Sequence, residues 1–575
     1  MLLKDEIKRS LAKALAALEI DGPDFTVEFT ADNSHGDYAS NVSLVAASAA
    51  GMNPRQLAER LLSAIELPKA CAKVEVAGPG FLNFFLRDKY LIDNLQTILD
   101  QGNRYGRRPA VAEAKSEVVL EYTNTNVLKP FHIGHLLGNV IGESLARLME
   151  AGGQKVRRVT YQGDSGLHIA KAVWGLKRSG GEKTGSLLEQ VAYLGQCYAD
   201  GAAAYENDPL AETEIKEINK RLFTGDDDEL SALYHFGRQV SLRHFDNLYA
   251  KLGTKFDHYF FESEVTTEAV NLVKENAAKG IFTESAGALV FIGENYDPTL
   301  HTRVFLTAQG LPTYEAKDIA HAWRKDRQYP TSTASIIITA VEQKQYFQVV
   351  LRALAEIYPA IADKTVHLAH GMLRLPTGKM SSRTGEVITA ETLIREVEEL
   401  VSVRLAENDM ASPESLADRE EIALRTQQIA IGAIKYSILR QDVGRDIIFD
   451  FERSISLAGD SGPYLQYSYV RTQSVLARAN WRLPADELKP AGEVGVLPRL
   501  LERYPEVIKR SIADRRPHHL CQYLFSLAAA FSSVYAAEKI IGSADEDYRL
   551  AETAAVGQVL KNGLDLLGIA VPDKM

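Results

Sequence analysis

One run of the chain, residues 117–161, limits the fold more than any other feature. Residues 117–122 (EVVLEY) have the apolar pattern of a short buried strand. A loop follows, then a helical period from Gly134 through Ala151, and then a second strand pattern, KVRRVTY, at 155–161. This order predicts a Rossmann-like α/β domain whose first loop lies at the carboxyl end of a strand, where such sheets bind ligands.

The turn from the first strand into the helix carries His132-Ile133-Gly134-His135. Two imidazoles three residues apart at a helix start point the same way, and the helix N-terminus adds partial positive charge and free N–H groups. Gly134 removes a side chain where a flat ring can lie against the backbone. The motif therefore indicates a site for nucleotide phosphates, and the competing interpretation is a chance His-x-Gly-His.

A second loop contains Lys379, Met380, Ser381, Ser382 and Arg383, between two Thr-Gly pairs. A lysine and an arginine among small, flexible residues can close over phosphates and neutralise the charge of a leaving pyrophosphate. Alone, such a loop is most often a solvated turn. Together the two motifs are far more specific, because a sheet that resumes after an insertion can bring residues 132 and 379 to one nucleotide.

The length of 575 residues predicts three or four structural units. Residues 1–105 have the pattern of an α+β domain, with a helix at 54–65 and a strand, turn, strand pattern over 73–86. Residues 106–420 are assigned to the α/β domain, with a helical insertion at about 175–295 and strand patterns that return at 303–307 and 335–340. Residues 421–575 are helical almost throughout and predict an all-α bundle.

Composition and charge are those of a globular protein. The formal net charge is −11, and residues 421–575 carry equal numbers of basic and acidic side chains, so the excess acid lies in residues 1–420. The three cysteines are far apart and form no metal-binding spacing, which fits a reducing cytoplasmic location. No run approaches the roughly 18 to 20 apolar residues of a membrane span, and the first 20 residues have the pattern of an amphipathic helix.

The two motifs, in this order, resemble the signatures of class I aminoacyl-tRNA synthetases, and within that class the chain is similar to the arginyl-tRNA synthetase family nearly end to end. The resemblance is carried by HGDYASN (35–41), VAGPGFLNFFL (76–86), NVLKPFHIGHL (126–136), LGTKFDHYFFESE (252–264), LPTYEAKDIA (311–320), KMSSRTGEV (379–387), FDFERSISLAGDSGPYLQYSYVR (449–471) and the terminal LLGIAVPDKM.

The resemblance implies ATP-dependent activation of L-arginine and its transfer to the 3′ end of tRNA(Arg), with AMP and pyrophosphate released. Catalysis is then positioning plus neutralisation of phosphate charge, without a protein nucleophile. Its catalytic residues would be His132, His135, Lys129, Lys379 and Arg383. ATP, with Mg²⁺ bridging its phosphates, would also contact Gly134, Gly163, Asp164, Met380, Ser381 and Ser382. No protein cluster for the metal is expected.

Selection of arginine needs carboxylates, because a planar guanidinium with five donors is recognised best by bidentate acceptors. In the family the matching pocket residues are Glu121, Asn126, Tyr314, Asp318 and Gln343. Tyr314 and Asp318 are four apart, which places them on one face of a helix. Without the resemblance, each would be interpreted as an ordinary strand end or amphipathic helix start.

The resemblance also implies that the helical C-terminal domain reads the tRNA anticodon and that the N-terminal domain contacts the tRNA elsewhere. Single-stranded bases are held by aromatic stacking and by cations on the backbone. The candidates are Asn83, Phe84, Tyr464, Tyr467, Arg471, Tyr535 and Met575. A stripe of tyrosines is more often helix packing than a platform for bases. The enzyme is expected to be a monomer.

The chain departs from the family pattern at four places. Asn124-Thr125-Asn126 stands where Ser-Pro-Asn is usual, and Ser165 stands at the aromatic position of Gly-Asp-Trp-Gly. Leu137 and Lys317 each replace a usual arginine. These departures concern the adenosine site and the path of the tRNA end.

Three alternatives remain open at this point. Another class I synthetase, for cysteine or a branched aliphatic amino acid, would need a zinc cluster or a large editing insertion that the chain lacks. A cofactor adenylyltransferase would leave the N-terminal and helical domains unexplained. A paralogue that binds tRNA without charging it is disfavoured by His132, His135 and Lys379.

Overall fold

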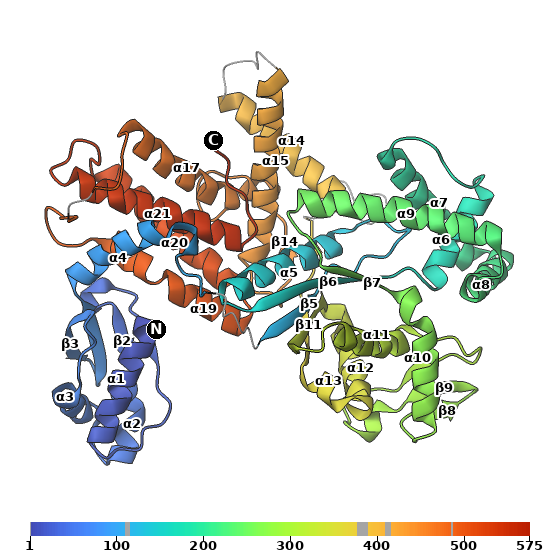
Figure 1. The fold of residues 1–575 in the computed structure, drawn as a ribbon, viewed down its shortest axis with the longest axis horizontal. Coiled ribbons are helices and arrows are strands. Elements are labelled where there is room, and N and C mark those ends of the chain that lie inside the picture. The colour runs from blue at the N-terminus through green and yellow to red at the C-terminus, as the bar shows by residue number, and fades with distance from the viewer. Residues whose placement is uncertain (1, 110–115, 376–388, 409–415, 485–486) are drawn as a thin grey trace.

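The computed structural model describes residues 2–109, 116–375, 389–408, 416–484 and 487–575. They form an elongated molecule (Figure 1). The N-terminal domain and the C-terminal helices lie toward one end, the helical insertion lies at the other, and the central sheet runs between them.

The N-terminal domain is a four-stranded antiparallel sheet packed against three helices. Its strands have the order β1-β2-β4-β3, with bounds Val27–Phe29, Tyr38–Ser40, Phe81–Leu86 and Cys71–Ala77. Helices α1 (Leu3–Ala17), α2 (Val42–Ala50) and α3 (Pro54–Ala64) bury their apolar faces in one core with it. Gly78 and Gly80 have φ of 50° and 136° in the turn between β3 and β4. The predicted strand, turn, strand pattern over 73–86 is confirmed.

The central sheet has five parallel strands in the order β12-β11-β5-β6-β7. They are β5 (Glu117–Glu121), β6 (Lys155–Gln162), β7 (His258–Phe261), β11 (Ser332–Ala340) and β12 (Thr365–His370). Helix α5 (Ile133–Ala151) connects β5 to β6, so the predicted strand, helix, strand unit and the Rossmann-like fold are confirmed. Because all five strands are parallel, their carboxyl ends meet at one edge of the sheet.

The insertion after β6 contains four helices, α6 (Leu167–Arg178), α7 (Leu187–Asn207), α8 (Pro209–Thr224) and α9 (Asp228–Lys251). The sequence assigned about 175–295 to this insertion, but that range also contains β7. Strand β7 pairs with β6, with His258 opposite Val159 at one end and Phe261 opposite Gln162 at the other. This edge strand belongs to the central sheet and is a correction to the predicted insertion. Four residues are too few to give a periodic signal.

The strand pattern at 303–307 was expected to continue the central sheet, and the structure contradicts this. Strand β10 (Arg303–Leu306) pairs antiparallel with β9 (Ala288–Phe291) in a separate sheet with β8 (Thr283–Ser285). An apolar run predicts a strand but does not specify its partner. The helices α10 (Glu262–Ala277), α11 (Tyr314–Gln328), α12 (Lys344–Ile357) and α13 (Pro359–Asp363) lie beside this small sheet and share a second core with it.

The C-terminal part is a helical bundle, as predicted. Its helices are α14 (Ala390–Asn408), α15 (Leu416–Leu439), α16 (Phe451–Ser454), α17 (Gly462–Arg478), α18 (Val496–Glu502), α19 (Tyr504–Asp514), α20 (His518–Ala537) and α21 (Glu546–Leu566). The short strands β13 (Leu373–Arg374) and β14 (Ile447–Ile448) join it to the end of the central sheet. Its core is continuous with the core around α5, so the bundle and the catalytic sheet are one packed unit.

The N-terminal domain is joined to the bundle through α4 (Asp88–Gln101) and through buried polar contacts. Tyr38 donates a hydrogen bond to Glu502 over 2.8 Å, and Arg499 forms an ion pair with Asp37 over 2.6 Å. Burial raises the pKa of Glu502 to about 7. These partners lie more than 450 residues apart in the sequence and were not predicted.

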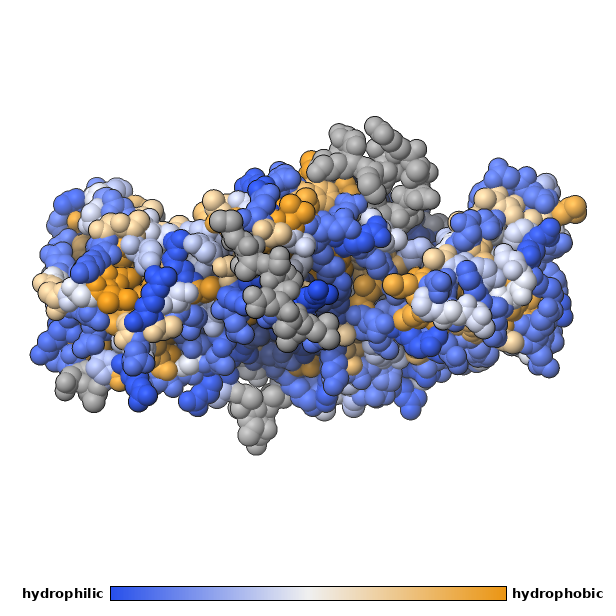
Figure 2. All heavy atoms as spheres, turned by 90° about the horizontal axis from the view of Figure 1, so that it is seen from above, coloured by the Kyte–Doolittle hydropathy of each residue, from blue (hydrophilic) through white to orange (hydrophobic). Residues whose placement is uncertain are grey.

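Within the part of the chain that the structure describes, one helix, α20, is long and apolar enough to cross a membrane by length and composition. Its Leu520, Leu524, Leu527 and Phe531 are buried in the bundle core, the arrangement of a core helix in a globular domain. The face of the molecule in Figure 2 is mostly hydrophilic, with apolar side chains in small groups.

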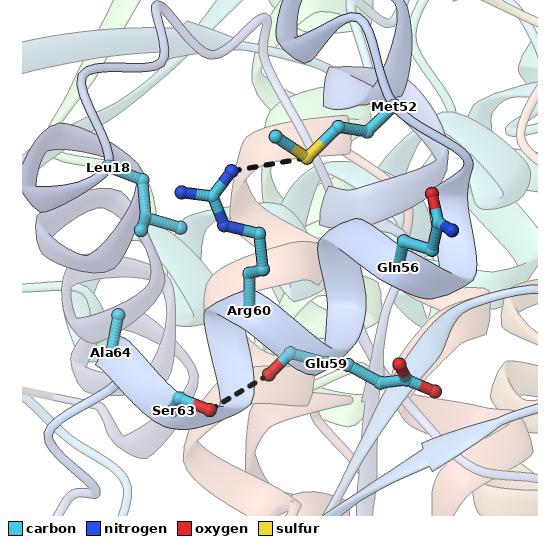
Figure 3. Close-up of a pocket in the computed structure, with 7 residues that line it drawn as sticks. All are labelled: Leu18, Met52, Gln56, Glu59, Arg60, Ser63 and Ala64. Atoms are coloured by element: carbon cyan, nitrogen blue, oxygen red, sulfur yellow. Dashed lines mark hydrogen bonds between the residues drawn. The ribbon is translucent and has the colours of Figure 1, made fainter.

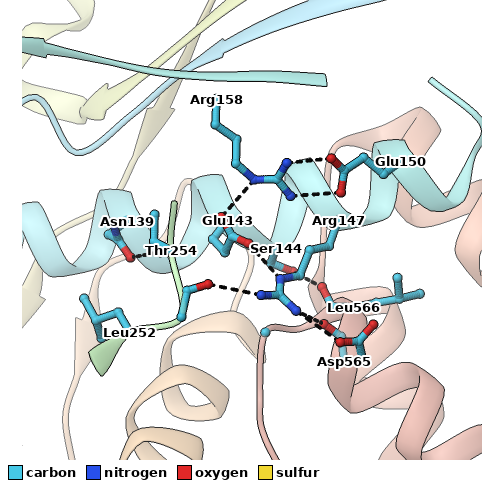
Figure 4. Close-up of polar contacts among 12 residues, drawn as sticks. Asn139, Glu143, Ser144, Arg147, Glu150, Arg158, Leu252, Thr254, Asp565 and Leu566 are labelled. Carbon is cyan, nitrogen blue, oxygen red and sulfur yellow. Dashed lines mark hydrogen bonds and ion pairs between the residues drawn. The ribbon is translucent and has the colours of Figure 1, made fainter. Parts of the chain in front are cut away.

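Helix α5 is bonded to the last helix of the bundle along its second half (Figure 4). Arg147 donates to the main-chain oxygen and the carboxylate of Asp565, both over 3.1 Å, and Ser144 donates to the main-chain oxygen of Leu566 over 3.2 Å. Glu143, buried on the same helix, accepts from Arg147 and Arg158. The helix that begins with the His-x-Gly-His motif is therefore fixed to the bundle.

Helix α5 packs tightly against the residue after β5 at Gly142, where an added Cβ would lie 2.2 Å from the ring of Tyr122. Both residues are buried, so Gly142→Ala forces a shift in a packed core. We expect a loss of about 1 to 3 kcal/mol in the free energy of unfolding, measured by urea denaturation.

The control is Gly195→Ala in α7, where the nearest atom to an added Cβ is 4.0 Å away. Alanine favours a helix over glycine by up to about 1 kcal/mol, so this variant should be as stable as the parent or more so. Equal stability of the two variants would show that the approach of α5 to Tyr122 is not tight.

Candidate active site

The carboxyl edge of the central sheet gathers the loops that follow its five strands. The loop after β5 runs from Tyr122 to His132, and the loop after β6 is Gly163-Asp164-Ser165-Gly166. Glu262 follows β7 directly, and a single helical turn, Val341–Gln343, follows β11. Most of the residues predicted for ATP and arginine therefore lie at one edge.

His132 and His135 form the first turn of α5. His132 is the N-cap residue, and its Nδ1 accepts hydrogen bonds from the main-chain N–H groups of Gly134 and His135 over 3.1 and 3.4 Å. The Nδ1 of His135 accepts from the main-chain N–H of His132 over 3.3 Å. The two rings are stacked with centroids 3.6 Å apart. The expectation that both imidazoles lie side by side at the helix start is met.

Both imidazoles are held in the neutral form. Burial lowers the pKa of His132, with a smaller contribution from Lys129, and it lowers the pKa of His135 well below its usual value. Because each Nδ1 is an acceptor, the ring proton of each neutral imidazole lies on Nε2. The helix start therefore presents two neutral N–H donors rather than two cations.

Cationic charge beside the histidines comes from Lys129, whose ammonium lies 5.1 Å from the ring centre of Tyr198 in α7. The second motif, with Lys379, Met380, Ser381, Ser382 and Arg383, lies outside the described residues. The described chain resumes at Thr389, which pairs with His132, and the N–H of Ala390 donates to the main-chain oxygen of Phe131 over 2.8 Å. Thr389 and Ala390 therefore lie beside the turn that holds the first histidine.

The loop after β6 lies against the loop after β5. Gly163 pairs with Asn126, and an added Cβ at Gly163 would lie 2.1 Å from the Asn126 side-chain oxygen, so any side chain there would force Asn126 to move. Asp164, predicted for ATP, is fully buried and accepts from Tyr234, Arg238 and Ser263. Its carboxylate ties the loop to the insertion and to α10.

Glu121, predicted for arginine, is buried at the end of β5 with its own cations. Lys325 and His321, both from α11, lie 2.5 and 2.9 Å from its Oε2, and Asn124 donates to its Oε1 over 3.0 Å. Burial raises the pKa of Glu121, but Lys325 and His321 outweigh burial and hold the pKa well below its usual range. The sequence did not reveal these partners, which lie 200 and 204 residues away.

Asp318 is a carboxylate at this edge that has no cation partner among the described residues. Tyr346 donates to its Oδ2 over 2.6 Å, and the described residues contribute no ion pair to it. Burial raises the pKa of Asp318 to about 8, with Glu121 and Glu262 adding to the rise and Tyr346 opposing it. A partly buried carboxylate without a cation is a site for a cationic ligand.

Tyr314 and Gln343, the other residues predicted for arginine, lie on the rim. Tyr314 is the first residue of α11, so it and Asp318 share one helix as predicted, and its side chain is 51% exposed. Its hydroxyl lies 3.4 Å from Nδ1 of His168, whose Nε2 lies 3.3 Å from the main-chain oxygen of Gly163. Gln343 is exposed at the end of the turn after β11.

Two departures from the family pattern contact each other. Lys317 donates to Ser165 over 2.9 Å and forms an ion pair with Glu262 over 3.1 Å, and Ser165 donates to Glu262 over 3.1 Å. Sequence reasoning identified Ser165 and Lys317 as unusual but missed Glu262. A cavity of about 440 Å³ opens beside them, lined by Ile169, Leu222, Phe223, Tyr234, His235, Thr267, Leu311 and Pro312.

Comparison with known proteins agrees with this geometry. Residues 94–451 match the model of the catalytic domain of class I (R) tRNA synthetases, residues 2–86 match the arginyl tRNA synthetase N-terminal domain, and residues 465–575 match the DALR anticodon binding domain. The chain is 31% identical to an arginine–tRNA ligase of Clostridium acetobutylicum over 91% of both chains, and 30% identical to that of Azotobacter vinelandii over 100% of both.

The chain belongs to the arginyl-tRNA synthetase family. Its fold matches the solved arginyl-tRNA synthetase of Thermus thermophilus with a TM-score of 0.81, at 24% identity and with both chains covered completely.

The residues predicted for tRNA differ in how they are exposed in this member of the family. Phe84 is fully buried in the core of the N-terminal sheet, so its ring has no face free for a base, and this prediction is wrong. Asn83 beside it is 7% exposed. On the same sheet, Phe81 is 38% exposed and the ammonium of Lys73 lies 4.3 Å from the ring centre of Phe85.

In the bundle, Arg471 lies between two predicted tyrosines. Its guanidinium is 4.6 Å from the ring centre of Tyr467 and 5.2 Å from that of Tyr535. Tyr464 packs against Phe525, and its hydroxyl lies 3.1 Å from that of Ser532. Met575 packs against the bundle core.

A shallow groove lies on the N-terminal domain (Figure 3). It is lined by Leu18, Met52, Gln56, Glu59, Arg60, Ser63 and Ala64, and Arg60 donates to the sulfur of Met52 over 3.4 Å. It contains none of the residues predicted for catalysis.

The ion pair of Glu121 and Lys325 should be essential to folding. Lys325→Met leaves Glu121 as a buried carboxylate without its closest cation, so we expect a loss of about 3 to 5 kcal/mol in the free energy of unfolding at pH 7.

The control is Lys177→Met, which breaks an exposed ion pair with Glu229 and should change stability by at most about 1 kcal/mol. Urea denaturation measures both. A Lys325→Met protein as stable as the parent would mean that the pair is not needed to compensate Glu121.

Proposed function

We propose that this chain activates L-arginine with ATP and transfers it to the 3′ end of tRNA(Arg), releasing AMP and pyrophosphate. The observation that carries the proposal is the open carboxylate of Asp318 at the sheet edge that also holds the neutral pair His132 and His135. A carboxylate suits a guanidinium, and neutral N–H donors at a helix N-terminus suit phosphates.

In the first step the arginine carboxylate attacks the α-phosphorus of ATP, the bond to the β-phosphate oxygen breaks, and pyrophosphate leaves. The Nε2–H groups of His132 and His135 donate to phosphate oxygens, and the first-turn N–H groups of α5 add partial positive charge. Lys129 supplies a cation on the same side. The protein positions the reactants and stabilises the developing charge.

Lys379 and Arg383 are proposed to hold the departing pyrophosphate, with Met380, Ser381 and Ser382 near the nucleotide. Arg383 is six residues from Thr389, a span of at most about 22 Å, so its chain can reach the nucleotide beside His132. Mg²⁺ would enter as part of the ATP substrate. Among the described residues, no group of three or more His, Cys, Asp or Glu side chains can hold a metal ion.

The arginine guanidinium is proposed to pair with Asp318, with Tyr314 at the entrance and Gln343 on the rim. Asn126 lies where the loops after β5 and β6 meet, and it is proposed to bond the amino-acid end of the substrate. Glu121, already paired with Lys325 and His321, acts by fixing the end of β5 and α11 rather than as an open ligand.

The tRNA is proposed to contact the bundle through Tyr464, Tyr467, Arg471, Tyr535 and Met575, and the N-terminal domain near Asn83. The cation held between two tyrosine rings supports a platform for an unpaired base. We further propose a cytoplasmic monomer, which fits three free, buried cysteines.

The test of the function is charging of tRNA(Arg) transcripts by the purified protein, with each of the twenty amino acids in turn. We expect ATP-dependent charging with arginine alone. Charging with another amino acid, or binding of tRNA without charging, would reject the proposal.

Asp318→Asn removes the charge for the guanidinium but keeps the size of the side chain. Because losing one partner of a desolvated charge pair costs about 2 to 5 kcal/mol, the KM for arginine should rise by about 30-fold or more. The KM for ATP should change little, which steady-state charging measures.

The control is Asp326→Asn on the same helix, where the carboxylate pairs with Lys364 away from the edge. This variant should keep the parental KM for arginine. An unchanged KM for arginine in Asp318→Asn would remove Asp318 from the pocket.

The use of arginine should also depend on pH. Asp318 binds a cation only when ionised, and because its pKa is about 8, protonation becomes dominant as the pH falls below that value. We expect kcat/KM for arginine to fall about tenfold for each pH unit below about 8, since this ratio reports the free enzyme. A flat profile from pH 9 to pH 6 would contradict the assignment.

A further inference from the structure

Four carboxylates lie at the carboxyl edge around the proposed guanidinium site. Glu121 pairs with Lys325 and His321, and Glu315 pairs with Arg303 over 2.9 Å. Glu262 pairs with Lys317, whereas Asp318 is bonded to the neutral hydroxyl of Tyr346. Three of the four thus have a cation of their own from the described residues, and the fourth does not.

Glu262 lies close to the proposed arginine ligands. It is 5% exposed at the junction of β7 and α10, and an atom added at Gly163 would lie 3.6 Å from Glu262 and 2.1 Å from Asn126. The ammonium of Lys317 also lies 5.4 Å from the ring centre of Tyr314. The carboxylate of Glu262 therefore adjoins the same space as Asn126 and Tyr314.

Lys317 is held in place on both sides. It is 6% exposed, it bonds Ser165 and Glu262, and Ser165 in turn bonds Glu262, so three side chains from the β6 loop, α10 and α11 close a ring of hydrogen bonds. A small hydroxyl at position 165 leaves room for the ammonium and gives it an acceptor.

We propose that Lys317, held by Ser165, is a positioning residue that offsets the charge of Glu262, so that Asp318 is the carboxylate of the arginine pocket left for the cation of the substrate. This inference rests on the proposed function. Its consequence is selectivity, because one open negative charge matches one guanidinium, whereas two adjacent carboxylates repel each other and hold a proton in place of the substrate.

The groups that face Asp318 come from every element around it. From β5 comes Glu121 with its partners, from α10 comes Glu262, and from α12 comes Tyr346. The full set is Glu121, His321 and Lys325, Glu262 and Lys317, Glu315 and Arg303, and the hydroxyls of Tyr161, Tyr314 and Tyr346. Among these groups, Glu262 and Lys317 form an ion pair whose members can be removed one at a time. Removing Lys317 makes the charge near Asp318 more negative, and removing Glu262 makes it more positive.

The test is the pH profile of kcat/KM for arginine in four proteins: the parent, Lys317→Met, Glu262→Gln and the double variant. Without Lys317, Glu262 disfavours ionisation of Asp318, so the midpoint should move to higher pH by about one unit and the KM for arginine at pH 7 should rise about tenfold. Without Glu262, Lys317 favours ionisation, so the midpoint should move to lower pH.

In the double variant, the midpoint of the pH profile should lie within about 0.3 pH unit of the parental midpoint, because the two charges are removed together. Lys317→Arg keeps the cation and should keep the parental midpoint. Lys364→Met, which removes a cation at the far end of α11 where it pairs with Asp326, is the matched control and should not shift the profile.

The proposal is supported if the two single variants shift the pH midpoint in opposite directions and the double variant restores it. Loss of a merely structural bond would not shift the midpoint in opposite directions. If Lys317→Met does not fold, the shift of the midpoint to lower pH in Glu262→Gln still tests the proposal. If the parent charges arginine but neither single variant moves the midpoint, the inference is overturned while the function stands. If the parent does not charge arginine, it is the function that fails.

Discussion

The close packing of helix α5 is the constraint on which the rest of the structure depends. Its first turn presents His132 and His135, its middle approaches the sheet at Gly142, and its second half is bonded to Asp565 and Leu566 of the last helix. One helix therefore fixes the two histidines relative to both the sheet and the bundle. Because the core around α5 continues into the bundle, the catalytic and helical parts cannot move independently at this junction.

The second constraint is the burial of charge at the sheet edge. Removing a carboxylate from water costs several kcal/mol unless a cation and hydrogen bonds compensate it. Lys325 and His321 outweigh the burial of Glu121, whereas Lys317 offsets the burial of Glu262 only in part and the pKa of Glu262 stays raised. These pairs hold β5, α10 and α11 together. Asp318 departs from this rule, and a group that the protein leaves uncompensated is where a ligand contributes most.

The sequence predicted the strand, helix, strand unit and the His-x-Gly-His turn because these depend on local periodicity and on residues close in the chain. It did not predict that β10 pairs with β9, or that Glu121 meets Lys325, since such pairings depend on which distant segments fold together. Phe84 was misplaced for a related reason. Alternation in a strand shows two faces, but only the packed helices decide which face is covered.

The neutral state of His132 and His135 suits a site that binds both an anion and a cation. ATP brings several negative charges, and arginine brings a guanidinium and an ammonium into the same small space. Two protonated imidazoles would repel that cation, whereas neutral N–H groups donate to phosphates without doing so. Burial and Lys129 keep His132 and His135 neutral, and the positive charge for the phosphates is left to lysines and the helix N-terminus. We therefore expect the phosphates at the start of α5 and the guanidinium at Asp318 on α11, two different elements of one edge.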